Sequence, residues 1–178
     1  NGLAVQAFAT TNMATASAMI TWVMFDALVG RRISAMGACI GAVVGLVAIT
    51  PAAGFVSVGQ SVFIGFVAAI ISNLAVYYKQ RTSLDDTLDV FPCHGVGGIV
   101  GMIMTGIFAK DVGLVNGETT TFLYHLLALV IVSAYTFFGS LIIYKITGLI
   151  TKMRVTKEEE RIGLDISQHS ESLVTTTN

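Results

Sequence analysis

Residues 85–101 read DDTLDVFPCHGVGGIVG, and this stretch places a titratable side chain inside an apolar segment. The last charged residue of the stretch is Asp89, and His94 follows it within the apolar run. At a helical rise of about 1.5 Å per residue, His94 lies ~7 to 8 Å deeper than Asp89. Such a residue inside a membrane is by default a functional hypothesis and faces the bundle interior or a cavity. The alternative is a packing histidine satisfied by a carbonyl of a neighbouring helix.

The composition around this stretch indicates a membrane protein. Hydrophobic residues make up 54% of the 178 residues and charged residues only 12%, whereas a soluble domain carries roughly a quarter of its residues as charges. A net charge of −1 gives no argument for a nucleic-acid partner. Cys39 and Cys93 lack the spacing of a metal or redox motif and are interpreted as small packed hydrophobes. We expect no metal and no cofactor.

Five apolar stretches are long enough to span a bilayer core, which needs about 20 residues. They are residues 4–29, 35–55, 58–78, 90–109 and 122–149. The sequence therefore predicts an all-α integral membrane domain over residues 1–151 and a polar tail over residues 152–178. The tail is either a disordered, solvated end or a segment that docks through its few apolar residues.

The basic residues predict the orientation, because Lys and Arg near span ends stay in the cytoplasm. If the first joint, at Arg31 and Arg32, lies inside, only Lys110 of the 10 basic residues lies outside. The N-terminal end is then external and the tail is cytoplasmic. An odd number of spans, an external start and no initiator Met lead us to expect a piece of a longer protein.

Two features of the second stretch concern packing and polarity. Gly37, Gly41 and Gly45 repeat every four residues, which places them on one helix face for close approach by another helix. Thr50 and Pro51 follow, and they indicate either a helix end at the interface or a polar contact that lines a conduit. Both interpretations of Thr50 stay open at this level.

The acidic residues before His94 have three interpretations. Asp85, Asp86 and Asp89 could cap the following helix, interact with the positive end of its dipole, or take part in proton or cation movement. Capping is expected for at least one of them. His125 lies near the outer end of the last stretch and is interpreted as an interfacial or packing histidine.

These motifs together resemble the ammonium transporter family (Amt/Mep proteins, with the Rh proteins as distant relatives). The resemblance rests on NGLA at residues 1–4, GLVAITPAAG at residues 45–54, DVFPCHGVGGI at residues 89–99 and EEERIGLD at residues 158–165. It implies an eleven-helix homotrimer in which each subunit has its own apolar pore, built from two inverted repeats of five helices. About five helices, most of the second repeat plus the last helix, would belong to this chain.

The resemblance also implies which residues matter. His94 is similar to one of the family's paired pore histidines, and Val90 and Thr50 are similar to pore-lining positions. Asp86 and Asp89 would support the site, and a structural role is expected for Asp86. The resemblance places the aromatic gate and the outer cation site in segments outside this chain.

The implied function is ammonium transport at the cell membrane: recruitment of ammonium, deprotonation, and passage of the neutral species beside the histidines. Alternatives are a passive Rh-type channel for ammonia or another gas, and an ammonium sensor. We do not expect an enzyme, because no nucleophile or metal-ligand pair accompanies His94. A cytoplasmic regulatory protein, or phosphorylation at Thr156, Ser167 or Ser170, would act on the tail.

Overall fold

The computed structural model describes residues 1–171, and residues 172–178 of the expected tail lie outside the described residues. All regular structure in the described range is helical, without a strand, which confirms the predicted all-α class. The chain divides into two units, Asn1–Ile131 and Val132–Asn178. The first unit carries every candidate pore residue.

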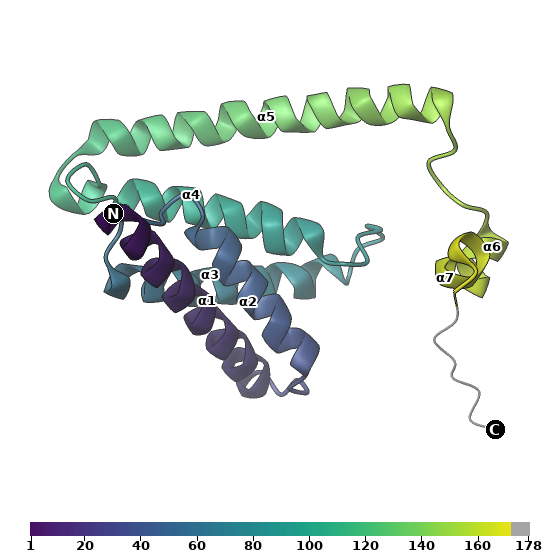
Figure 1. Cartoon of the computed structure of the whole chain (residues 1–178), viewed down its shortest axis with the longest axis horizontal. Coiled ribbons are helices and arrows are strands. Elements are labelled where there is room, and N and C mark those ends of the chain that lie inside the picture. The colour runs from purple at the N-terminus through teal and green to yellow at the C-terminus, as the bar shows by residue number, and fades with distance from the viewer. Residues whose placement is uncertain (172–178) are drawn as a thin grey trace. The chain divides into compact units, whose positions relative to one another are not determined.

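Helices α1 to α4 of the first unit pack together, with α2 and α3 between α1 and α4 in the contact order (Figure 1). Helix α1 contacts α2 and α3, and α4 contacts the same two helices. The elements are α1 (Gly2–Leu28), α2 (Ala35–Ile49), α3 (Val58–Lys79), the π-helical turn η1 (Phe91–Val96), α4 (Gly97–Phe108) and the 3-10 turn η2 (Leu114–Asn116). Helix α5 (Thr119–Ile150) begins in the first unit and ends in the second, which also contains α6 (Lys157–Ile162) and α7 (Leu164–His169).

Side-chain caps fix where two of the bundle helices begin. The Ser34 hydroxyl accepts a hydrogen bond from the Gly37 N–H at 2.9 Å and so begins α2. A capping box begins α3, in which Ser57 Oγ accepts from Gln60 N and Gln60 Oε1 accepts from Ser57 N. These bonds satisfy N–H groups that have no partner within a helix.

The predicted glycine face of α2 is confirmed as a contact surface. A Cβ atom at Gly41 would lie 2.6 Å from the Trp22 Cβ, and one at Gly45 would lie 2.6 Å from the Ala14 carbonyl oxygen. Helix α1 therefore approaches α2 closely enough to exclude a side chain at these positions. On α4, a Cβ at Gly101 would collide with the Ala48 backbone, whereas Gly97 leaves ordinary contact distances.

The second apolar stretch is shorter as a helix than expected. Helix α2 ends at Ile49, and turns follow through Phe55, with Gly54 at a φ of 84°. Residues 35–55 are thus a 15-residue helix of about 22 Å plus a turn, not one continuous span. The helix-end interpretation of Thr50 and Pro51 is correct in this respect.

Three helical segments within residues 1–171 are long and apolar enough to cross a membrane: Val58–Lys79, Phe91–Phe108 and Thr119–Ile150. Helix α1 has 27 residues, but several Thr residues, Asn12 and Asp26 lower its hydropathy. The expectation of five spans therefore holds for three segments by length and hydropathy, while α1 and α2 fall outside that criterion.

Candidate functional site

His94 lies on a π-helical turn that runs directly into α4. The turn covers Phe91–Val96, and Pro92 is its second residue. At that position the N–H that proline lacks would have no hydrogen-bond partner within the helix. A π-turn contains an extra residue relative to an α-helix and occurs frequently at functional sites. The π-turn therefore distinguishes residues 91–96 from the regular helices around them.

Asp86 caps this turn. Its Oδ1 accepts from the Val90 N–H at 2.8 Å and its Oδ2 accepts from the Phe91 N–H at 2.9 Å. The Phe91 N–H, then the Val90 N–H and the nearby Lys79 charge, hold the pKa of the Asp86 carboxyl below its usual value. The expectation that at least one of the acidic residues caps the helix is confirmed, and Asp86 is that residue.

Asp89 and Lys79 form a second anchor for the turn. Lys79 Nζ lies 2.6 Å from Asp89 Oδ1, and both side chains are mostly buried. Lys79 also donates to the Asp86 carbonyl at 2.5 Å. Asp89 has a φ of 54°, a left-handed conformation that Asp tolerates better than most residues. The end of α3 is thereby tied to the chain that enters η1.

The His94 side chain lines a hollow of about 260 Å³ and is exposed within this chain. The other lining residues are apolar or thiol-bearing: Met36, Cys39, Ile40, Val43, Leu88 and Cys93. No carbonyl from residues 1–171 binds the His94 imidazole, in contrast to His125, whose Nδ1 lies 3.4 Å from the Met102 carbonyl oxygen. The carbonyl partner that a packing histidine would have is therefore not found for His94 among residues 1–171, and its place on a conduction path stays a prediction.

Val90 and Thr50, the other two predicted pore residues, are not among the residues that line this hollow. Val90 is exposed one turn before His94. Thr50 is exposed at the end of α2, and its hydroxyl donates to the Leu46 carbonyl at 2.7 Å. Met36, Val43 and Thr50 follow one another at seven-residue intervals, so they share one face of α2. That face leads from the hollow to Thr50.

Sequence analysis missed a buried polar network at one end of α1. Asn73 Nδ2 donates to Asp26 Oδ1 at 3.0 Å, and Arg31 Nη1 lies 3.3 Å from the same oxygen and 2.5 Å from Asn73 Oδ1. The three residues line a cavity of about 200 Å³ that also contacts Asp89. The available signal was Asp26 itself, the one charged residue in the apolar stretch 4–29.

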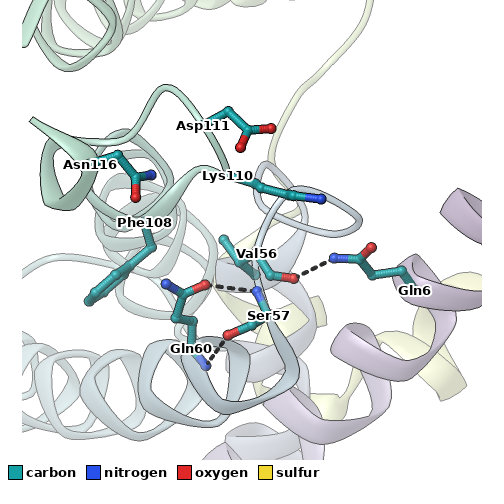
Figure 2. Close-up of a pocket in the computed structure, with 8 residues that line it drawn as sticks. All are labelled: Gln6, Val56, Ser57, Gln60, Phe108, Lys110, Asp111 and Asn116. Carbon is teal, nitrogen blue, oxygen red and sulfur yellow. Dashed lines mark hydrogen bonds between the residues drawn. The ribbon is translucent and has the colours of Figure 1, made fainter. Parts of the chain in front are cut away.

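A larger hollow, of about 380 Å³, lies among the beginnings of α1 and α3 and the end of α4 (Figure 2). Gln6 Nε2 donates to the Val56 carbonyl at 2.9 Å, and the Ser57 and Gln60 capping box forms the adjacent wall. Lys110 and Asp111 supply charges of opposite sign at the rim. From the sequence, only the polar loop that begins at Lys110 could be predicted here, and not the hollow.

Within the described residues of the tail, 152–171, the chain forms two short helices, α6 and α7. A capping box of Thr156 and Glu159 begins α6, and hydrogen bonds from the Thr156 side chain and backbone hold the pKa of Glu159 below its usual value. The Ser167 hydroxyl donates to the Gly163 carbonyl at 2.8 Å. Ile162, Leu164 and Ile166 remain exposed within this unit.

Comparison with known proteins gives one consistent result. Residues 1–174 match the model of the Ammonium Transporter Family. An ammonium transporter of Bacillus subtilis is 36% identical over 179 residues, which cover 96% of this chain and 44% of the relative. The crystal structure of Candida albicans Mep2 matches with a TM-score of 0.80 and 38% identity, over 88% of this chain and 38% of that one. A structure described as a sensor Amt protein matches with a TM-score of 0.82 and 27% identity, over 94% and 42%.

Proposed function

Because this chain belongs to the ammonium transporter family, we propose that it supplies one wall of a pore for ammonium or ammonia, with His94 on the conduction path. The chain spans less than half the length of the curated relatives it matches, so the activity belongs to the whole protein. The observation that carries the proposal is the position of His94 on a π-turn that faces an apolar hollow. Membership of a transporter family agrees with the expectation that the protein is not an enzyme.

The chemistry of the hollow favours a neutral guest. A bare ammonium ion would have to leave water for walls of Met, Ile, Val and thiol groups, at a large desolvation cost. A neutral imidazole has one donor and one acceptor, so it can exchange hydrogen bonds with ammonia. The proposed mechanism is deprotonation before the hollow and passage of ammonia beside His94, Val90 and Thr50.

Asp86 and Asp89 support this site by holding the turn. Neither lines the hollow, and both bind the backbone or Lys79. Their proposed role is to fix the π-turn, and therefore the His94 ring, relative to α3.

The same membership supports a cell-membrane protein with an external N-terminal end, a cytoplasmic tail and a homotrimeric assembly. The distribution of Lys and Arg favours this orientation. The exposed apolar residues of α6 and α7 and the hydroxyls of Thr156, Ser167 and Ser170 are the proposed regulatory surface. A cytoplasmic protein or a kinase would act there.

Cys39 offers a direct test, because this exposed thiol lines the same hollow as His94. A membrane-permeant alkyl methanethiosulfonate should attach to Cys39, obstruct the hollow, and strongly reduce methylammonium uptake by the full-length protein. The matched control is Cys39→Ala, which should transport normally and resist the reagent, because Cys93, the second thiol of this hollow, is only 4% exposed. If mass spectrometry shows full modification of Cys39 while uptake persists, the hollow is not the pore.

A sensor is the second candidate, because the sensor Amt protein has a similar fold and 27% identity. Transport separates the two functions: a sensor with a closed pore would show no uptake at any tested concentration, while it still bound ammonium.

A further inference from the structure

Two arginines meet at one tyrosine ring where α1 and α3 end. Arg31 follows the end of α1, and Arg81 follows the end of α3. The Arg31 Cζ lies 4.8 Å from the centroid of the Tyr77 ring, and the Arg81 Cζ lies 4.0 Å from it. Arg81 Nη2 also donates to the Tyr77 hydroxyl. Both distances are within the range of a cation–π contact, so one ring holds two like charges close together.

The carboxylates of the described residues neutralise only one of these two charges. Asp26 Oδ1 lies 3.3 Å from Arg31 Nη1. No carboxylate of residues 1–171 forms an ion pair with Arg81, or with Arg32, which is exposed next to Arg31. This end of the α1 and α3 pair therefore carries cations that lack a protein counter-ion.

The acidic residues before the π-turn are occupied by other partners. Lys79 Nζ lies 2.6 Å from Asp89 Oδ1. The two carboxylate oxygens of Asp86 accept from the N–H groups of Val90 and Phe91. These carboxylates hold the turn, so they do not compensate the arginine charges.

The two guanidinium groups also keep unused donors. A guanidinium has five N–H donors in a planar fork. Arg31 uses Nη1 for Asp26 and Asn73, and its side chain is 32% exposed. Arg81 is exposed and uses Nη2 for the Tyr77 hydroxyl. The other donors form no hydrogen bond to residues 1–171. An anion with several oxygens matches such forks, and phosphate is the biological group of that kind.

The surroundings of the arginines favour a phosphate that belongs to a lipid. Leu28, the last residue of α1, is 81% exposed, and Tyr78, beside Tyr77, is 63% exposed. Tyrosines and basic residues at helix ends are typical of the boundary between hydrocarbon and headgroups. This is also the end proposed to be cytoplasmic, where cell membranes carry anionic lipid.

We propose that Arg31, Arg81 and the Tyr77 ring form a binding site for the phosphate group of an anionic phospholipid headgroup, with Arg32 adding charge beside it. The headgroup would supply the missing counter-ion, and its acyl chains would lie along the exposed apolar residues of the helix ends. This site is separate from the His94 hollow, so it does not depend on the transport mechanism.

Lipid binding to the full-length protein in detergent tests the site directly. Native mass spectrometry should show phosphatidylglycerol retained in preference to phosphatidylcholine, and phosphatidylglycerol should raise Tm where phosphatidylcholine does not. Equal retention and equal Tm shifts for the two lipids would overturn the proposal.

Arg81→Gln removes a charge without breaking the buried Asp26 network. The apparent affinity for phosphatidylglycerol should fall about tenfold, the effect of losing one hydrogen bond to a charged group. Lys110→Gln is the matched control. It removes one exposed charge near the other end of α3, where the Lys110 N–H donates to the Phe55 carbonyl at 2.7 Å. Equal losses in the two variants would show attraction by net charge alone and overturn the site.

Tyr77→Leu separates a built site from a diffuse charge effect. Every cation remains in this variant, but the ring that both guanidinium groups contact is lost. The affinity for phosphatidylglycerol should therefore fall although the net charge is unchanged. Wild-type affinity in Tyr77→Leu would contradict the site.

Inorganic phosphate distinguishes the two sources of the group. If the occupant is a lipid headgroup, millimolar phosphate should not raise Tm beyond a chloride control of equal ionic strength. A phosphate-induced rise as large as that from phosphatidylglycerol, and lost in Arg81→Gln, would overturn the lipid as the source. If neither phosphate nor lipid gives a shift that depends on Arg81, the site itself is overturned.

Discussion

At the residue scale, the side chains before His94 determine how the histidine is presented. Asp86 binds two backbone N–H groups at the start of the π-turn, and Asp89 pairs with Lys79. His94 then lines the hollow without a protein partner among residues 1–171. The acidic residues therefore hold the turn, and no described residue hydrogen-bonds the His94 imidazole.

Asp86→Ala should lower the thermal stability of the protein at neutral pH, because two N–H groups lose their acceptor. The Asp86 pKa is lowered in the folded state, so its stabilising contribution is complete above the unfolded-state pKa of about 3.9. The contribution is lost as pH falls through the lower, folded-state pKa. Tm measured for wild type and variant from pH 7 downward should converge only at the acid end. Convergence well above pH 4 would contradict the capping role.

The sequence predicted part of the candidate site. His94 stood out because it is titratable within an apolar run, and capping was expected from the position of the Asp residues. Which Asp caps was not predictable, since that depends on the left-handed turn at Asp89. The Asp26 network was missed because its partner Asn73 is 47 residues away, and no local pattern encodes that contact.

At the element scale, the close approach of α1 and α2 depends on glycine. A Cβ at Gly45 would lie 2.6 Å from the Ala14 carbonyl oxygen and 2.8 Å from the Ala18 Cβ. Neither group is the flexible end of a long side chain, so the helices themselves would have to separate. The contact is thus sensitive to a single methyl group.

Gly45→Ala should destabilise the protein by about 1 to 3 kcal/mol, the usual cost of overpacking a core. Gly59→Ala is a suitable comparison, because a Cβ there meets nothing within 4 Å in this chain. Thermal unfolding in detergent measures both effects. Equal stability of the Gly45 and Gly59 variants would show that the helices separate at little cost.

Hydropathy predicted where the helices lie, and the helix-facing glycine repeat followed from its four-residue spacing. Hydropathy alone did not locate two features. Helix α2 stops at Ile49 because the chain turns through Pro51 and Gly54, although the residues remain apolar, and Thr50 with Pro51 had indicated this end only as one of two interpretations. The π-turn at Phe91–Val96 depends on the Asp86 cap and on packing against α2 and α3, and no sequence period reveals it.

At the scale of the whole molecule, the exposed apolar residues are consistent with a chain that forms part of a larger structure in a membrane. Large hydrophobic side chains are exposed on α1 and α5, for example Phe8 at 73% and Tyr135 at 79%. A lipid bilayer is the surrounding that family membership supports for them. The family could be predicted from the sequence motifs, whereas the surfaces that the bilayer covers could not.

The central claim is that His94 lies on the conduction path, and the most direct measurement is methylammonium uptake with simultaneous current in proteoliposomes. The full-length wild type should be compared with His94→Ala and with His125→Ala as the packing-histidine control. The account predicts at least a tenfold change, on the order of 1.4 kcal/mol in the transport barrier, in uptake or current for His94→Ala alone, at an equal amount of folded protein in the liposomes. Wild-type uptake and current in His94→Ala would contradict it.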